Sequence, residues 1–268
     1  MNDLLRALRA WPTLLRVGLA EMVAYRAELV IWILTSTTPL IMMVIWSRAS
    51  QDGAVGDYDA DALARYFVAT LIVRQLTGCW LVWEMNQDIR TGAFSVQLLR
   101  PVNPLLIHAA NTLAVIPFRV LLLVPLVGAL LLWKPAAADA LGQVAWLPFA
   151  LSLTAAWLIN FFVQAMMGCL AFWWRQSLGI FNVWHALFLI SSGYVFPLSL
   201  LPPGIRGFAE ASPFAYLMSA PVELLSGRLQ GAAAWQAVGG GALWALLCGV
   251  GAAVVWRRGV AHHEAVGA

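Results

Sequence analysis

The sequence predicts an all-α membrane protein with six transmembrane helices. The chain has 268 residues, of which 62% are hydrophobic and 11% are charged. Soluble domains have about half apolar and about a quarter charged residues, so this composition favours the bilayer as solvent. The apolar residues also form long stretches, and a helix needs about 20 of them to cross the hydrocarbon core. All the carboxylates lie outside the centres of these stretches.

Six stretches are long enough to span. They cover residues 27–47, 63–83, 105–133, 144–174, 178–197 and 235–256. Prolines lie inside the first and third of them, and we expect these prolines (Pro39, Pro117 and Pro125) to kink their helices. Residues 26–268 are therefore expected to form one six-span membrane domain.

The distribution of basic residues predicts the orientation, because loops on the cytoplasmic side carry more lysine and arginine. With a cytoplasmic N-terminus, nine basic residues lie inside: Arg6, Arg9, Arg16, Arg26, Arg90, Arg100, Arg175, Arg257 and Arg258. Five lie outside: Arg48, Arg65, Lys134, Arg206 and Arg228. This bias predicts that both termini are cytoplasmic.

Residues 1–25 have the pattern of an amphipathic helix rather than of a signal peptide. Leu4, Leu8, Trp11 and Leu15 share one stripe, and Arg6, Arg9, Thr13 and Arg16 share the opposite side. We expect this helix to lie at the cytoplasmic interface, with its arginines toward lipid phosphates. A helix packed on another part of the protein is the alternative.

Several chemistries are excluded by the residues present. A phosphate-binding P-loop needs a lysine, and the only lysine, Lys134, precedes a proline in an outer loop. The chain is therefore not expected to be an enzyme that hydrolyses ATP. The three cysteines are far apart, and the four histidines have no metal-ligand spacing, so we expect no metal site. A net charge of +3 is too small to indicate nucleic acid as a partner.

A polar tract, DIRTGAFSVQLLRPVNP, covers residues 88–104 between the second and third spans. Gly92 permits a tight turn, and the prolines Pro101 and Pro104 end the helix that follows. Ile89, Phe94, Leu98 and Leu99 would form an apolar ridge on this helix, while Asp88, Arg90 and Gln97 stay available to a partner. Such a ridge is suited to a groove on another protein, and an interfacial loop lying on lipid is the alternative.

A second tract, SSGYVFPLSLLPPGIRGFAEASPFAY, covers residues 191–216 after the fifth span. Its four prolines forbid one continuous helix, yet it is too apolar for an ordinary exposed loop. A broken apolar segment at membrane depth must be buried in protein or line a cavity. We expect an outer gate, with a lid on the outer surface as the alternative.

These two tracts, with six spans and an amphipathic N-terminal helix, resemble the permease subunits of type-2 ATP-binding-cassette (ABC) transporters. The likeness is to a bacterial branch of about 260 residues and covers nearly the whole chain. The resemblance implies an exporter in the bacterial inner membrane. It also implies two ATPase subunits that bind ATP and Mg, and a second permease, either the same chain or a similar one.

The resemblance further implies a coupling helix within the loop 84–104 and a re-entrant outer segment at 197–216. The residues expected to couple to the ATPase are Asp88, Ile89, Arg90, Gly92, Phe94, Leu98, Leu99, Arg100 and Pro101. Those expected at the outer gate are Tyr194, Phe196, Pro197, Leu201, Pro202 and Phe214.

Four polar residues within the spans are candidates for the transport pathway: Arg74, Gln75, Asn160 and Gln164. Arg74 either faces a cavity or reaches the carbonyls of a neighbouring helix. Asn160 and Gln164 lie one turn apart, and such pairs more often hold helices together than bind ligands. Arg119 lies nearer the cytoplasmic end and is expected to extend to the interface.

The predicted function is the membrane subunit of an ATP-driven exporter. A membrane-embedded enzyme, such as a lipid-modifying one, would need acids, bases or metal ligands that converge within the spans. A structural or assembly subunit without a transport role is the third interpretation.

Overall fold

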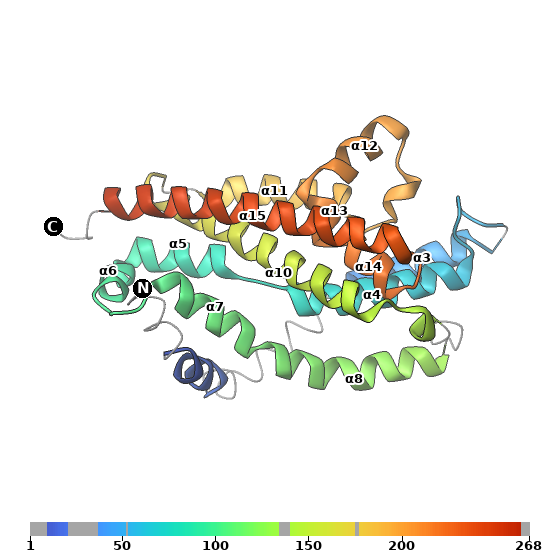
Figure 1. Cartoon of the computed structure of the whole chain (residues 1–268), viewed down its shortest axis with the longest axis horizontal. Coiled ribbons are helices and arrows are strands. Elements are labelled where there is room, and N and C mark those ends of the chain that lie inside the picture. Colours follow the sequence, from blue (N-terminus) through green and yellow to red (C-terminus); the bar gives the residue numbers. More distant parts are fainter. Residues whose placement is uncertain (1–9, 21–36, 52, 134–139, 175–176, 264–268) are drawn as a thin grey trace.

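The computed structural model describes residues 10–20, 37–51, 53–133, 140–174 and 177–263. Within these ranges the named elements are all helices (Figure 1). The longer ones are α3 (Thr38–Ala49), α4 (Ala60–Thr77), α5 (Leu81–Thr91), α7 (Pro104–Ala114), α8 (Ile116–Trp133), α10 (Trp146–Cys169), α11 (Leu178–Ser191), α12 (Pro203–Ala211) and α15 (Gly231–His262). The shorter ones are α6 (Ala93–Leu98), η1 (Ala140–Gln143), η2 (Leu170–Phe172), η3 (Leu198–Leu200), α13 (Pro213–Leu217) and α14 (Ser219–Leu225).

Four helical segments are long and apolar enough to cross a membrane, and each matches an expected span. They cover Ala60–Thr91, Pro104–Trp133, Trp146–Phe172 and Gly231–His262. The second expected span, 63–83, therefore ends eight residues before the helical segment Ala60–Thr91 does. The polar residues after 83 remain helical because Met85, Asn86 and Ile89 are buried against the rest of the protein.

The other two expected spans are less complete. The fifth contains α11, which has 14 residues and is shorter than a full crossing requires. The first contains α3, and the preceding residues 27–36 lie outside the described part of the chain. Along the third span the helix is interrupted at Val115, two residues before Pro117, whereas Pro125 lies inside α8.

The helices α10 and α15 pack along their length (Figure 1), and the main buried cluster joins them to α4. Glycines on α15 face large side chains on α10 and on η2, which follows it. A Cβ at Gly249 would lie 3.1 Å from the Phe162 ring, and one at Gly259 would lie 2.3 Å from the Phe172 ring. In a bilayer the hydrophobic effect does not drive helices together, so their association depends on close packing. Small residues at the contact allow this close approach. Substituting these glycines would push α15 away from its partner.

The outward faces of α8, α11 and α15 carry exposed apolar side chains. Examples are Leu121, Val124, Val183, Leu187, Leu246 and Val250. An exposed apolar surface of this extent in water would cause association, but it is the expected surface against lipid tails. The arrangement thus agrees with a multi-pass membrane protein.

The N-terminal helix covers residues 10–20 in the described part and lies across α7 (Figure 1). A Cβ at Gly18 would lie 2.9 Å from the Ala114 Cβ, so the two helices are in close contact. Trp11 packs against a buried cluster, while Thr13 and Arg16 are exposed. The apolar and polar sides expected for these positions are present, while Leu4 and Leu8 lie outside the described residues. The interfacial location of the helix stays a prediction.

The ends of the helices separate into two poles. Helix 10–20, α6 and the C-terminal end of α15 lie at one pole, and α12, the loop at 53–59 and the start of α15 lie at the other (Figure 1). The basic-residue bias predicts that the first pole is cytoplasmic.

Cysteine labelling tests this topology, because the three native cysteines are all buried and should give little background. A cysteine at the exposed Ala54 should react with an impermeant maleimide in intact cells. One at the exposed Thr91 should react only after permeabilisation. Labelling of both sites from the same side would contradict the arrangement of the helices, and the reverse pattern would overturn the orientation.

Candidate functional site

The segment Ala60–Thr91 is not one helix, because it breaks between Thr77 and Leu81. Gly78 has φ −59° and ψ 131°, which ends α4 and starts a non-helical connection of three residues, 78–80. A break exposes backbone carbonyls that water cannot reach at membrane depth, and each unpaired group costs several kcal/mol. No proline marks this break in the sequence, and it was not predicted.

Arg119 on α8 pairs with two of these carbonyls. Its Nη1 donates hydrogen bonds to the carbonyl oxygens of Gln75 at 2.9 Å and of Gly78 at 2.8 Å. The side chain is only 8% exposed, so the expectation that Arg119 extends to the interface was wrong. The carbonyls freed by the break are nearer than the interface and accept the guanidinium hydrogens directly.

The side chains of Asn160 and Gln164 on α10 pair with two more backbone carbonyls at the break. The Asn160 amide nitrogen donates to the Thr77 carbonyl at 2.8 Å, and the Gln164 amide nitrogen donates to the Cys79 carbonyl at 2.9 Å. Gln164 also donates to the Asn160 side-chain oxygen at 3.1 Å and accepts from the Val82 N–H at 3.4 Å. The interpretation that this pair holds helices together is confirmed, because both amides bridge α10 to the break.

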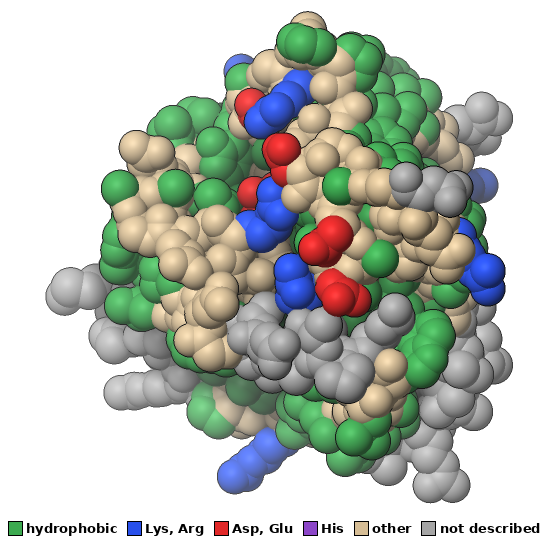
Figure 2. Space-filling view, turned by 90° about the vertical axis from the view of Figure 1, so that its right-hand side faces the viewer, with side chains coloured by type: hydrophobic (Ala, Val, Ile, Leu, Met, Phe, Trp, Pro, Cys, Tyr) green, Lys and Arg blue, Asp and Glu red, His purple; other side chains and the backbone are tan. Residues whose placement is uncertain are grey.

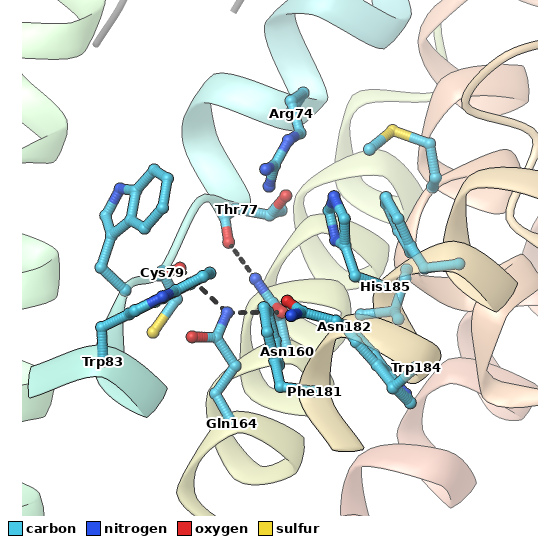
Figure 3. A pocket seen from close by; sticks show the side chains of 14 residues that line it. Arg74, Thr77, Cys79, Trp83, Asn160, Gln164, Phe181, Asn182, Trp184 and His185 are labelled. Atoms are coloured by element: carbon cyan, nitrogen blue, oxygen red, sulfur yellow. Dashed lines mark hydrogen bonds between the residues drawn. The ribbon is translucent and has the colours of Figure 1, made fainter. Parts of the chain in front are cut away.

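A cavity of about 240 Å³ lies beside the break (Figure 3). Arg74 points into it from α4, and the His185 and Trp184 side chains approach it from α11. Of the four pathway candidates, Arg74, Asn160 and Gln164 line the cavity, whereas Gln75 is buried outside it. The other lining residues are Thr77, Cys79, Trp80, Trp83, Phe181, Asn182, Phe188, Leu217 and Met218.

The outer segment packs against the aromatic wall of this cavity. The Tyr194 ring lies 5.8 Å from Phe188, and the Phe214 ring lies 5.7 Å from Trp184. The Arg74 guanidinium carbon lies 6.0 Å from the Tyr194 ring centre. Two expected gate residues, Tyr194 and Phe214, therefore contact the cavity wall.

The segment after α11 is broken, as its prolines predict, into η3, α12, α13 and α14. Two carbonyls of this segment accept side-chain hydrogen bonds: the Tyr66 hydroxyl donates to the Gly193 carbonyl at 2.6 Å, and the Trp46 indole N–H donates to the Val195 carbonyl at 3.0 Å. Of the remaining expected gate residues, Pro197 is buried, Phe196 and Leu201 are half-buried, and Pro202 is exposed.

The polar tract at 84–104 begins as helix rather than as loop. The chain turns at Gly92, whose φ of +78° confirms the expected tight turn, and six residues of α6 follow. Pro104 then begins α7, where the Asn103 side-chain oxygen accepts from the Leu105 N–H at 2.9 Å.

Two residues expected on the partner-facing ridge point inward instead. Ile89 is 6% exposed, and Phe94 is fully buried. The Phe94 ring packs edge-on against Phe172 at 5.3 Å, Trp256 at 5.6 Å and His263 at 5.6 Å between ring centres. Phe94 cannot serve as a side chain that enters a pocket on a partner, because the protein's own helix ends already enclose it.

The exposed surface of this tract is made by other residues. Leu99 is 86% exposed and Val96 is 60% exposed. Arg90, Arg100 and Pro101 are exposed as well, and Leu98 is half-buried. We call this set the α6 surface: Arg90, Val96, Leu99, Arg100 and Pro101. Val96 was not included in the expected ridge. Which face of a six-residue helix is exposed depends on which side the rest of the protein covers.

A polar pocket of about 450 Å³ lies between α5, α6 and α7. His108 is buried there, with its Nδ1 3.0 Å from a Glu84 carboxylate oxygen and its Nε2 3.8 Å from an Asp88 oxygen. Gln97 donates to the same Asp88 oxygen at 2.8 Å. These contacts tie α6 to α5 and α7. Among the described residues, no group of three or more His, Cys, Asp or Glu could hold a metal ion.

A second pocket, of about 470 Å³, opens at the opposite pole, where acidic and basic side chains gather in a band (Figure 2). Arg228 covers the Tyr58 ring at 4.0 Å, and Arg206 pairs with Glu210 at 2.7 Å. Glu223 accepts a hydrogen bond from the Ser219 hydroxyl at 3.3 Å, and burial raises the pKa of this carboxyl above its ordinary value. This pocket was not predicted, because its residues come from three separated parts of the chain.

Replacing Arg119 with methionine tests the hydrogen bonds at the break. Two buried carbonyls would lose their donor, and each unpaired group costs about 1–3 kcal/mol. We expect a clearly lower thermal unfolding temperature for the purified protein in detergent. Arg74→Met is the matched control, because Arg74 makes no hydrogen bond to the described residues. Equal stability of the two variants would contradict a structural role for Arg119.

Comparison with known proteins identifies the family of this chain. The sequence model described as ABC-2 family transporter protein matches residues 32–267, which is most of the chain. No curated protein matches the sequence. The match covers the helix break, the cavity, the outer segment and the α6 surface together. The chain therefore belongs to the ABC-2 transporter family, and it is a membrane permease subunit rather than the ATPase.

Proposed function

We propose that this permease exports its substrate across a bacterial cytoplasmic membrane, powered by two separate ATPase subunits and paired with a second permease. The observation that carries the proposal is the cavity beside the break at 78–80, which the outer segment covers. Bound ATP and Mg belong to the ATPase partners. A substrate at Arg74 would lie near the middle of the span Ala60–Thr91.

The structure supports a route by which a partner's movement reaches this cavity. The α6 surface is exposed at the pole expected to be cytoplasmic. From there α5 runs without interruption to the break, where Cys79 and Trp80 line the cavity. A push on α6 would thus shift α5 against α4 at the break, which is a hinge of the kind used in domain closure.

Export, rather than import, follows from the resemblance to exporting permeases, and the segment after α11 supplies a barrier that substrate would have to pass. Tyr194 and Phe214 pack against the aromatic wall of the cavity, so the segment that carries them would have to move for substrate to leave outward. Short helices that connect through prolines, such as α12 and α13, are suited to such a movement.

A membrane-embedded enzyme is less well supported. None of the described residues that line the cavity beside Arg74 has a carboxylate, and the Asn160 and Gln164 amides already bond to the backbone. The pocket around His108 does hold two carboxylates, but they bond to side chains on neighbouring helices.

A double substitution of the α6 surface tests the coupling. Val96→Ala with Leu99→Ala should lower the amount of ATPase that co-purifies by more than tenfold. Burying an apolar side chain contributes about 1.5–3 kcal/mol, and about 1.4 kcal/mol is tenfold in affinity. The measurement is the ATPase-to-permease ratio after a pull-down in mild detergent, with the affinity tag in the loop at 53–57.

The matched control is Leu132→Ala, because Leu132 is 85% exposed and precedes the last residue of α8, a helix whose C-terminal end lies at the opposite pole (Figure 1). It should leave the ratio unchanged. Phe94→Ala should act differently, by lowering the yield of folded permease, since truncating a buried phenylalanine costs about 3–5 kcal/mol. An unchanged ratio for the double variant would mean that the α6 surface lies on lipid.

A further inference from the structure

We infer that the cavity beside Arg74 binds an organic anion with a flat aromatic body. This inference rests on the proposed function, since it names the class of substrate that the permease would carry. Three observations support it: a cation in the cavity that the protein does not neutralise, a wall of aromatic rings, and polar groups placed to bind a second oxygen of the anion.

The cation is the Arg74 guanidinium, which points into the cavity from the middle of a membrane span (Figure 3). Among the described residues none forms a hydrogen bond or an ion pair with it, and its contact is the Tyr194 ring at 6.0 Å. Arg119, the neighbouring arginine, differs because two carbonyls accept its hydrogens. An arginine charge at this depth is costly, and a bound anion would neutralise it.

The lining carries no charge that opposes this preference. None of the described lining residues is acidic, so an organic cation would meet Arg74 without a counter-charge. A carboxylate, in contrast, matches the planar fork of a guanidinium with two parallel hydrogen bonds. The residues that line the cavity therefore favour a negatively charged substrate.

The wall of the cavity is aromatic on two sides. Trp80 and Trp83 on one side lie 4.9 Å apart, and Trp83 meets Phe181 at 4.6 Å. On α11 the Phe181 ring stacks on Trp184 at 5.7 Å, and Trp184 stacks on Phe188 at 5.9 Å. Flat rings bind against such a wall by stacking and by burial of apolar area. A volume of about 240 Å³ limits the ligand to a compact ring system.

Two further polar side chains are placed to hold the anion. His185 and Asn182 face the cavity from α11 (Figure 3). Both can donate a hydrogen bond to an oxygen that Arg74 does not reach. Gln164 cannot take this role, because its amide nitrogen donates both hydrogens, to the Cys79 carbonyl and to the Asn160 side-chain oxygen, whereas the Asn160 amide donates one hydrogen to the Thr77 carbonyl and keeps a second donor.

Three probes that share a naphthalene ring but differ in charge test the effect of charge alone. They are 2-naphthoate (negative), 2-naphthylmethanol (neutral) and 2-naphthylmethylammonium (positive). Binding is measured by calorimetry on the full-length permease in nanodiscs of net-neutral lipid. We expect naphthoate to bind at least tenfold more tightly than the alcohol, and the ammonium compound to bind most weakly. Equal binding of naphthoate and the ammonium compound would overturn the inference.

Variants of Arg74 then assign the preference to this residue. Arg74→Gln should weaken naphthoate binding at least tenfold, Arg74→Lys should retain most of it, and Arg74→Glu should favour the ammonium compound. The control is Arg48→Gln, an exposed arginine of α3 outside the cavity, which should change nothing. Unchanged naphthoate binding in Arg74→Gln would overturn the inference. If the Arg74 variants do not fold, the ranking of probes on the unmodified protein decides.

A transport assay separates this inference from the proposed function. In vesicles that contain the permease and its ATPase, ATP-driven movement of naphthoate that Arg74→Gln abolishes would support both. Binding through Arg74 without ATP-driven movement would keep the ligand class and overturn export. ATP-driven movement of the ammonium compound in preference to naphthoate would keep export and overturn the ligand class.

Discussion

The hydrogen bonds from Arg119, Asn160 and Gln164 to the carbonyls around Gly78 hold four helices in one arrangement. A broken helix at membrane depth is stable only if other groups replace the lost backbone hydrogen bonds. Here α8 and α10 supply them, so these helices must lie on either side of the α4–α5 connection.

The same constraint divides the polar residues of the spans by role. Arg119 and Asn160 have their donors directed at the backbone. Arg74, one turn before the break, has no such acceptor and faces the cavity. Arg119 thus replaces a lost backbone donor, whereas Arg74 is left with its guanidinium hydrogens directed at the cavity.

The sequence predicted what depends on local chemistry. The lengths of the apolar stretches predicted the long helices, Gly92 predicted the turn, and the prolines predicted the broken outer segment. It did not predict the break at 78–80, which needs donors from residues 41 and 85 positions away. It also misplaced Phe94, because a short amphipathic helix shows an apolar face without showing whether that face meets its own chain or another.

The burial of Phe94 has a practical consequence for handling the protein. Because its ring and the Ser95 hydroxyl contact His263, the last described residue of the chain lies directly against α6. A fluorescent protein or purification handle fused shortly after that histidine would begin beside the α6 surface and could block it sterically. Loss of activity in such a fusion would then report obstruction by the added domain, not a defect of the permease.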